Sequence, residues 1–259
     1  MQMEKQNCNH EWVERNNKNI CSKCDKNYLI LKDTEHPGLQ IGIKDTGENY
    51  SVRTGRLRYF FPLEWEEFIF NISDSKKIIF ETLLITGARI EEAMMIKKSH
   101  IYLDNKYLIL YNTKIKSKKK ERKQTQREVI LPKQFIRQLK NYINTMNDED
   151  FIFLNNDRLV GLDTKQIKII AGKKALNVYQ IFKRAISKTK IEDPWNFSLH
   201  NIRKSCGMWL KAMNVKESEI CFRLGHDMNT YIKHYGSPDR FGSNDKIKIA
   251  NKFSGIYGI

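Results

Sequence analysis

The sequence lacks the features of a membrane or exported protein. No stretch of its 259 residues approaches the roughly 20 apolar residues that a transmembrane helix needs. The N-terminal residues MQMEKQNCNHEW contain no apolar signal region. The five cysteines are odd in number, which in a chain without an export signal fits a reducing interior with metal-bound or free thiols. We therefore expect a cytoplasmic protein with no membrane partner.

Acidic residues are scarce beside basic ones. Asp and Glu number 30 against 46 Lys and Arg, which gives a net charge of +16 and a pI near 9.5. A polyanion is the natural partner of such a chain. Solvated lysines account for part of the charge, so the composition favours nucleic-acid binding without establishing it. The length and the hydrophobic fraction of 40% suffice for one large domain plus a small appendage.

No carboxylate cluster accompanies the most informative residues of the chain, which lie within residues 198–238. This segment contains His200 and Arg203 as H-x-x-R, then Leu-Gly-His ending at His226, then Tyr235 nine residues later. Positions three apart share a helix face, so His200 and Arg203 can point into one site. The missing acidic ligands argue against two-metal phosphate chemistry.

The residue types in this segment suit attack on a phosphodiester without a metal ion. Arg binds phosphate through two parallel hydrogen bonds, and His transfers a proton near neutral pH. Tyr becomes a nucleophile when a base and cations stabilise its developing charge. Each motif alone has an ordinary structural interpretation, namely a capping pair, a helix end and a packing residue. Tyr231, one helical turn before Tyr235, is a rival nucleophile, so only the ordered set is informative.

A further arginine, Arg89, follows an expected helix that begins near residue 73. Gly87 lets the chain leave that helix, and Arg89 then stands at the start of the next one, where backbone N–H groups favour an anion. The alternative is a surface pair of Arg89 with Glu91 or Glu92. We expect Arg89 to be a second phosphate ligand and Glu92 to orient the catalytic residues.

A basic hairpin is predicted between strands at residues 107–111 and 128–131. A solvated loop is the ordinary interpretation of such a charge run. Because this run joins two strands, we expect it to project and contact the DNA backbone. Lys114, directly after the first strand, is expected to protonate a leaving oxygen, with Lys116 as its competitor. The residues expected to bind DNA are Lys116, Lys118, Lys119, Lys120, Arg122 and Lys123.

The N-terminal residues hold a candidate metal site. Cys8 and His10 precede Cys21 and Cys24, and thiolate and imidazole ligands at these spacings suit a closed, tetrahedral structural zinc site. The alternative is a disordered tail with stray cysteines. We expect a zinc-ribbon-like module over residues 1–36 and a linker over residues 37–56, where glycine, Pro37 and mixed polar residues predict loop.

Helices are predicted over residues 133–146, 176–188 and 216–224, and another carries His200 and Arg203. The tail after residue 239 is expected to form a helix that packs on its own domain or on a neighbouring copy. Cys206 and Cys221 have no metal-ligand spacing and are expected in the core.

In their order along the chain, the candidate residues resemble the signature of the tyrosine recombinase (phage integrase) family. The matching positions are Arg89 in TGARIEEA, Lys114 in NTK, His200 and Arg203 in HNIRKS, His226 in RLGH, and Tyr235. The step from His226 to Tyr235 matches the family and favours Tyr235 over Tyr231. The resemblance covers about residues 57–240. It implies an α+β, mainly helical catalytic domain with a small antiparallel sheet, here over residues 57–259 with the C-terminal tail.

The resemblance also implies a function. A recombinase or integrase, as found on mobile elements, cuts and rejoins double-stranded DNA through a 3′-phosphotyrosine intermediate and needs no cofactor for catalysis. It acts with further copies of itself, as a dimer or tetramer on DNA. A type IB topoisomerase uses nearly the same residues, and a catalytically silent DNA-binding regulator can keep the same scaffold, so both alternatives stay open. The family usually carries a helical core-binding domain before the catalytic one, and residues 1–56 do not resemble it.

Overall fold

The computed structural model describes residues 58–111, 126–191, 194–235 and 240–259 in full, and between residues 12 and 52 it describes the backbone of short strands. These strands form two antiparallel sheets, β1-β2-β3 and β4-β5-β6. Their bounds are β1 Trp12–Arg15, β2 Lys18–Cys21, β3 Asn27–Tyr28, β4 Leu31–Lys32, β5 Gln40–Ile43 and β6 Asn49–Val52. The paired β5 and β6 lie in the segment that we expected to be a linker, which is a correction to that expectation. The domain boundaries themselves stay predictions.

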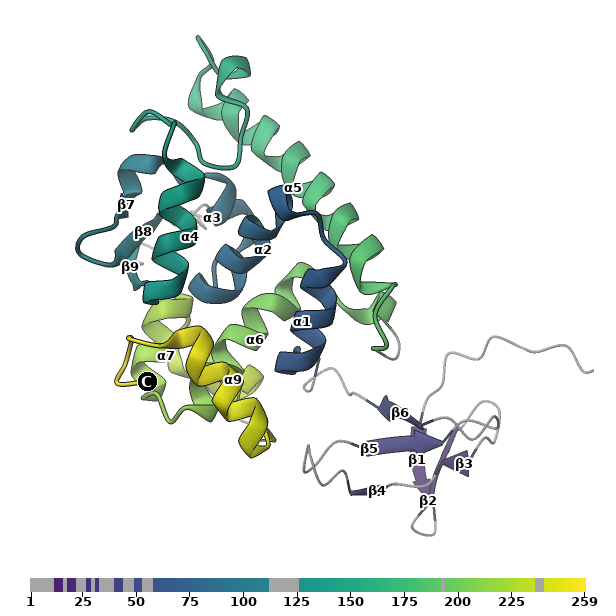
Figure 1. Ribbon diagram of the computed structural model, residues 1–259. Coiled ribbons are helices and arrows are strands. Elements are labelled where there is room, and N and C mark those ends of the chain that lie inside the picture. Colours follow the sequence, from purple (N-terminus) through teal and green to yellow (C-terminus); the bar gives the residue numbers. More distant parts are fainter. Residues whose placement is uncertain are drawn as a thin grey trace, which may run out of the picture.

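The remaining described residues are mainly helical with one small antiparallel sheet (Figure 1). This confirms the fold predicted for the catalytic domain, whereas the zinc-ribbon-like module stays a prediction. The helices are α1 Pro62–Phe70, α2 Asp74–Thr86, α3 Ile90–Met94, α4 Lys133–Ile143, α5 Thr164–Ile186, α6 Leu199–Ala212, α7 Glu217–Leu224, α8 Met228–Tyr235 and α9 Ser243–Phe253. Short 3-10 turns are η2 Lys98–His100, η3 Asn156–Arg158 and η4 Pro194–Asn196. No helix in these described ranges is long and apolar enough to cross a membrane.

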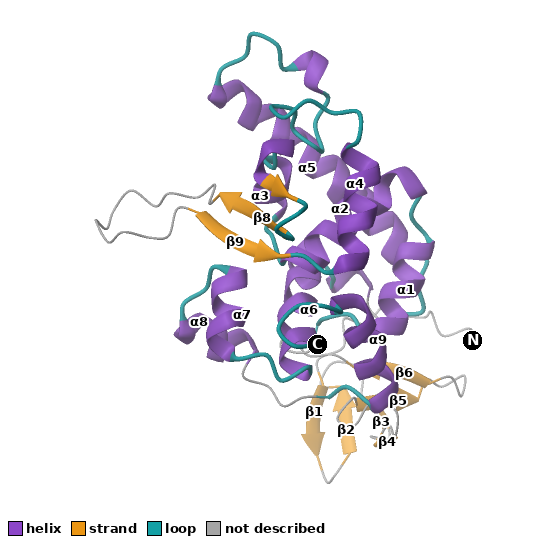
Figure 2. Cartoon of the chain, turned by 60° about the vertical axis from the view of Figure 1, so that its left-hand side comes forward, coloured by secondary structure: helices purple, strands orange, loops and turns teal. Residues whose placement is uncertain are grey.

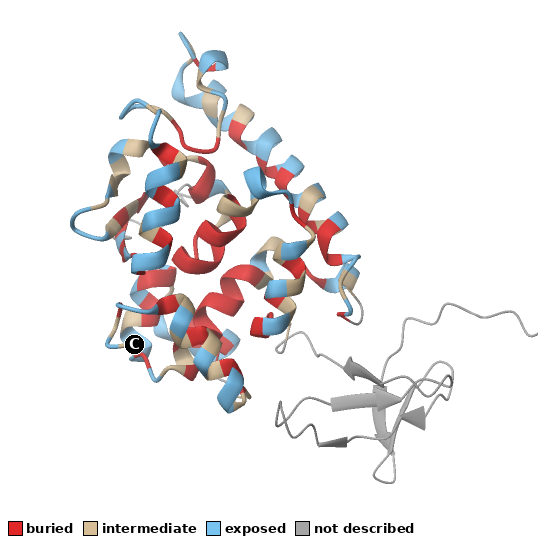
Figure 3. Ribbon diagram, in the orientation of Figure 1, coloured by how far each residue is buried: buried red, intermediate tan, exposed pale blue. Residues whose placement is uncertain are grey.

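The core is centred on α2 and α6, whose facing sides are buried (Figure 3). In α2, Phe80, Leu83 and Leu84 recur at helical spacing and are all buried. Phe60 fills the adjoining space, with its ring 5.3 Å from both Phe68 and Phe197. The first turns of α6 carry His200 and Arg203, and the segment that follows α2 leads to Arg89.

The sheet has the order β7-β8-β9, with β7 Ile101–Tyr102, β8 Tyr107–Tyr111 and β9 Gln126–Ile130. The register pairs Leu108 with Val129 and Leu110 with Arg127, and these four side chains are buried. β8 and β9 therefore lie as predicted within two residues, whereas the short β7 was not predicted. Figure 2 shows β8 and β9 as a two-stranded ribbon at the edge of the helical body.

Helix α5 is longer than predicted, because it begins at Thr164 and not near residue 176. Its start is fixed by a capping box in which Gln166 N–H donates to Asp163 Oδ1 (2.8 Å) and Asp163 N–H donates to Gln166 Oε1 (2.9 Å). That motif was a signal for the earlier start. The buried face of α5 runs through Ala171, Val178 and Phe182.

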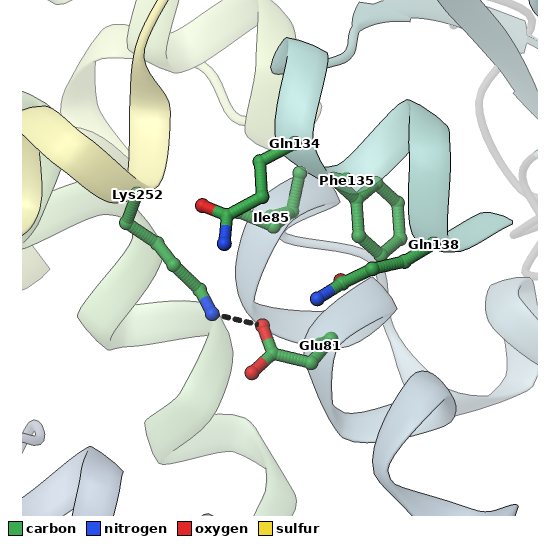
Figure 4. A pocket seen from close by; sticks show the side chains of 6 residues that line it. All are labelled: Glu81, Ile85, Gln134, Phe135, Gln138 and Lys252. Atoms are coloured by element: carbon green, nitrogen blue, oxygen red, sulfur yellow. Dashed lines mark ion pairs between the residues drawn. The ribbon is translucent and has the colours of Figure 1, made fainter.

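The C-terminal tail forms α9 and packs on its own domain, against α1 and α6. Phe253 is fully buried, and Lys252 Nζ lies 2.6 Å from Glu81 Oε2 on α2. Figure 4 shows this ion pair beside Gln134 and Gln138 of α4. Of the two expected positions for the tail, on its own domain or on a neighbouring copy, the structure shows the tail on its own domain.

Candidate active site

Arg89 stands where the sequence predicted, as the N-terminal cap of α3. The chain reaches it through Gly87, which ends α2 with φ of +63°. A Cβ on Gly87 would lie 2.3 Å from Leu224 Cδ2, so both the backbone angle and the close approach require glycine. The Arg89 side chain is 37% exposed and its Nη1 donates to Glu92 Oε1 at 2.8 Å. Arg89 therefore pairs with Glu92 and still reaches solvent.

His200 and Arg203 lie on the first turns of α6. Ser198 caps the helix, and Asn201 accepts a hydrogen bond from Ser198 N–H (2.7 Å) and donates to Arg58 O (2.7 Å). His200 is exposed, whereas Arg203 is buried. Arg203 donates through Nη1 to Gly87 O and through Nη2 to Leu224 O. It therefore joins the segment before Arg89 to the segment before His226.

His226 lies between α7 and α8, and Tyr235 ends α8. α7 ends at Gly225, with φ of +60°, and His226 N–H donates back to Cys221 O at 3.0 Å. Tyr235 is the last residue of α8 and only 1% exposed. Its ring meets the His226 ring edge-on (centroids 5.8 Å apart) and stacks on Tyr231 (5.4 Å). A Cβ on Gly207 of α6 would lie 2.5 Å from Tyr235 Cε1, so Gly207 leaves room for this ring.

One buried carboxylate, that of Glu92, organises the arginines around it. Its Oε2 accepts hydrogen bonds from Arg89 N–H (2.9 Å) and from Arg127 Nη2 (2.6 Å). Arg203 Nη1 lies 3.9 Å from the same oxygen. Burial alone would raise the pKa of Glu92, but the hydrogen bond and charge of Arg127, with Arg89 and Arg203, hold that pKa below its ordinary value. Glu92 is thus an anion with arginines on three sides.

Arg127 is a site residue that sequence reasoning missed. The sequence alone counted it in the basic run, whereas the structure places it in β9 with its side chain buried. A signal was present, since Arg127 and Val129 alternate with Gln126 and Glu128 and so share one face of the strand.

The cations of the site act on its histidines and on Tyr235. Burial, together with the charges of Arg203 and Arg89, lowers the pKa of His226 to about 3. The same causes lower the pKa of His200 to about 4, and because His200 is exposed we expect solvent to screen part of this effect. Burial lowers the pKa of Arg203 to about 10, which leaves it charged at neutral pH. Burial raises the pKa of Tyr235, against the pull of Arg203 and Arg89.

Two buried nitrogens of the site have no hydrogen-bond partner among the described residues. They are Nε of Arg203 and Nε2 of His226. Buried polar groups in folded proteins are nearly always paired, so these two need an explanation. An anion that accepts from Arg203 Nε, and a polar ligand group that hydrogen-bonds to His226 Nε2, would satisfy both.

Several predicted residues lie outside the described part of the chain. Lys114 and the expected DNA-binding residues all fall within residues 112–125, and Cys8, His10 and Cys24 also lie outside it. Cys21 ends β2, but its side chain is not described. The described residues do bring together Arg89, His200, Arg203, His226 and Tyr235. His234 is exposed and Cys206 and Cys221 are buried free thiols, as expected.

Comparison with protein families decides the broader identity. The profile of the Phage integrase family matches residues 64–240, which is more than half of the chain. This range includes the five site residues Arg89, His200, Arg203, His226 and Tyr235. The chain belongs to the phage integrase family. Comparison with curated protein sequences gives no match.

Solved structures of similar fold include integrases and recombinases. The integrase of transposon Tn1549 in complex with a circular intermediate DNA is 15% identical, with a TM-score of 0.53 over 75% of this chain and 65% of that one. The same integrase with transposon right end DNA is 14% identical, with a TM-score of 0.52 over 76% of this chain and 65% of that one. The XerA recombinase is 20% identical, with a TM-score of 0.49 over 75% of this chain and 62% of that one. At these identities the likeness to the two Tn1549 integrase structures establishes the fold alone. This chain spans less than two thirds of each of the three structures.

Proposed function

We propose that this phage integrase family member is a DNA strand transferase that cuts and rejoins double-stranded DNA through a 3′-phosphotyrosine intermediate. The observation that carries the proposal is the convergence of Arg89, His200, Arg203, His226 and Tyr235 from four separate segments onto one site with unpartnered nitrogens. DNA in the Tn1549 integrase structures supports a DNA partner for the fold.

The proposed reaction exchanges one phosphodiester for another. Tyr235 Oη attacks the phosphorus, the bond to the 5′ oxygen breaks, and the strand is held as a 3′-phosphotyrosine. The proton of Tyr235 passes to His226, whose ring is neutral at pH 7 and becomes a stronger base once a bound phosphate offsets the cations that lower its pKa. Lys114, which lies outside the described residues, donates a proton to the departing 5′ oxygen. Attack by a 5′ hydroxyl reverses these steps and rejoins the strand, so no nucleotide is consumed.

The arginines stabilise the charge that develops on the phosphate. Arg89 is partly exposed and Arg203 presents an unpartnered Nε, so both have donors for the non-bridging oxygens. A bound phosphate also raises the pKa of His200 and His226, because it offsets the positive charges that now depress them. Replacing Arg203 by Ala should slow cleavage about 10²–10³-fold, by analogy with the loss of one oxyanion donor.

Tyr235 is proposed as the nucleophile in preference to Tyr231. Both rings are buried, but Arg203 and Arg89 act on Tyr235, whereas Tyr231 meets no such cation among the causes that raise its pKa to about 12. Because Tyr235 is 1% exposed, DNA binding must be accompanied by a shift of this ring before attack.

Covalent trapping tests the proposal. Wild type, Tyr235→Phe and Tyr231→Phe are incubated with nicked duplexes from the DNA that flanks the gene, and the products are separated on a denaturing gel. The expected result is a protein–DNA adduct with wild type and Tyr231→Phe and none with Tyr235→Phe. An adduct that persists with Tyr235→Phe would refute the assignment. DNA binding without any adduct would favour the silent regulator, and relaxation of supercoiled DNA without rejoining to a second duplex would favour the topoisomerase-like alternative.

The proposal includes a positively charged surface for the DNA backbone. Residues 112–125 hold the candidates Lys116, Lys118, Lys119, Lys120, Arg122 and Lys123, and their support is the sequence alone. If the protein neutralises about 6–10 phosphates, duplex affinity falls roughly 10³–10⁵-fold between 50 and 200 mM salt. A dimer or tetramer on DNA also stays a proposal, which mass measurement of the protein–duplex complex would test.

The proposal also retains a structural zinc ion in the N-terminal segment. Its support is the spacing of Cys8, His10, Cys21 and Cys24. Zinc content of the purified protein near one ion per chain, reduced by Cys21→Ser or Cys24→Ser, is the expected result. Wild-type protein that contains no zinc after purification without chelators would contradict it.

A further inference from the structure

Arg127 connects three segments of the structure through one buried guanidinium. It lies in β9 opposite Leu110 and is 2% exposed. Its Nη2 donates to Glu92 Oε2 at 2.6 Å, and its Nε donates to Arg223 O at 2.8 Å. A Cβ on Gly225 would lie 3.4 Å from Nη1, so the planar group also packs against the backbone just before His226.

These contacts end at the residues that hold the proposed phosphate ligands. Glu92 accepts from both the backbone N–H and Nη1 of Arg89, and it lies near Arg203 Nη1. Arg127 makes the shortest of the ion pairs to this carboxylate. With Arg127 in place, one of the three neighbouring arginines is committed to Glu92, and the net charge of the group is positive. Arg89 and Arg203 therefore keep positive charge to offer to an anion.

We infer that Arg127 is a positioning residue, which through Glu92 sets the orientation and free charge of Arg89 and Arg203 and through Arg223 O holds the backbone before His226. The inference rests on the proposed function. It also links the sheet to the site, because Arg127 stands on the strand that directly follows residues 112–125, where Lys114 and Lys116 lie.

Loss of Arg127 changes the charged surroundings and the pKa of Glu92. In Arg127→Met the buried carboxylate keeps only Arg89 and Arg203 as charged neighbours. The pKa of Glu92 then rises, because burial now outweighs the remaining cations. Where Glu92 stays ionised, it draws Arg89 and Arg203 toward itself and away from a phosphate. A protonated Glu92 no longer orients Arg89 through an ion pair, and an ionised one competes with the phosphate for Arg89 and Arg203, so the loss of rate depends on pH.

If the Arg127–Glu92 ion pair served stability alone, its loss would lower the free energy of unfolding and leave the reaction rate of the folded molecules unchanged. The test therefore combines equilibrium unfolding with the rate of covalent adduct formation on a nicked duplex between pH 5.5 and 8.5. A second readout is the rise in melting temperature caused by inorganic phosphate over chloride at equal ionic strength, which reports anion binding without any reaction.

The variants are Arg127→Met, Arg127→Lys and Arg137→Met. Arg137 is exposed on α4, so its variant removes a positive charge without altering the surroundings of Glu92. For Arg127→Met we expect about a 10²-fold slower reaction, the scale of a small misplacement of catalytic groups. We also expect an acid limb shifted to higher pH and a smaller phosphate-induced rise. Arg127→Lys keeps the charge and should restore the wild-type pH profile with part of the rate, whereas Arg137→Met should behave like wild type.

The outcomes separate the inference from the proposed function. An unchanged rate and pH profile in folded Arg127→Met would overturn the inference and leave the proposed function standing. If Arg127→Met does not fold, a wild-type pH profile with part of the rate in Arg127→Lys would support the inference, and a folded Arg127→Lys with a shifted pH profile and no phosphate response would overturn it. If wild type forms no adduct but is stabilised by phosphate, the proposed function fails and the phosphate response still tests Arg127. If wild type shows neither, both fail.

Discussion

Replacement of Gly207 by Ala tests the position of the Tyr235 ring, the proposed nucleophile, against α6. Gly207 lies inside α6, and an added Cβ would meet Tyr235 Cε1 at 2.5 Å, Tyr235 Cδ1 at 2.9 Å and Leu224 Cδ1 at 3.0 Å. Distances below 3.0 Å force a neighbour to move, and the tyrosine ring is the neighbour that meets the Cβ most closely. Gly207→Ala should therefore displace Tyr235 from the contact that buries it.

The size of the effect follows from two opposing contributions. Gly→Ala within a helix stabilises by about 0.8–1.0 kcal/mol, whereas overpacking a well-filled core costs about 1–3 kcal/mol. The net destabilisation of Gly207→Ala should thus lie at about 0–2 kcal/mol. Gly172 supplies the matched control, because it lies inside α5 with nothing within 4 Å of the added Cβ. Gly172→Ala should gain about 0.8–1.0 kcal/mol, and the difference between the two variants, about 1–3 kcal/mol, isolates the steric contribution.

Denaturant unfolding measures both variants, and absorbance titration follows the tyrosine. Burial raises the pKa of Tyr235, so its release in Gly207→Ala should bring that pKa back toward the ordinary value of about 10. Subtraction of the titration of Gly207→Ala/Tyr235→Phe isolates the one ring. Equal stabilisation of the two glycine variants, with an unchanged titration of Tyr235, would show that the ring does not occupy this position against α6.

The remaining predictions concern pH and the C-terminal tail. Melting temperature should fall as pH drops from 7 to 5, because the pKa of His226 is about 3 and that of His200 about 4 in the folded protein, while both lie near 6.5 when unfolded. The unfolded chain then binds more protons in this window, so stability rises with pH there, and His226→Leu should flatten the dependence measured by calorimetry. Phe253→Ala should lower the free energy of unfolding by about 3–5 kcal/mol, since the ring is fully buried. Lys248→Met, which breaks the exposed pair of α9 with Glu66 on α1, should lower it by about 1 kcal/mol or less, and comparable losses in the two variants would contradict an apolar anchor for α9.

The sequence by itself determined the elements whose signals are local. Thr86-Gly87 ended one helix and Leu224-Gly225 another, and in each case glycine adopts the positive φ that other residues avoid. The short run of aliphatic and aromatic residues YLILY predicted β8 with its observed bounds. The ordered set from Arg89 to Tyr235 identified the family, because its residue types and spacings are rare in combination. The start of α5 was missed although the Asp163–Gln166 capping box was present, since the exposed Lys and Ile residues after it obscure the helical period.

Only the tertiary structure decided which charges meet in the interior. Glu92 and Arg127 are 35 residues apart and lie on different elements, and no local pattern joins them. Their pairing follows from the packing of α3 against the β8-β9 ribbon and of α7 against β9. The burial of Tyr235 likewise depends on Gly207 and Tyr231, which the fold brings into contact with its ring. Ion pairing and burial depend on distance in space, and a sequence specifies that distance only within a single helix or strand.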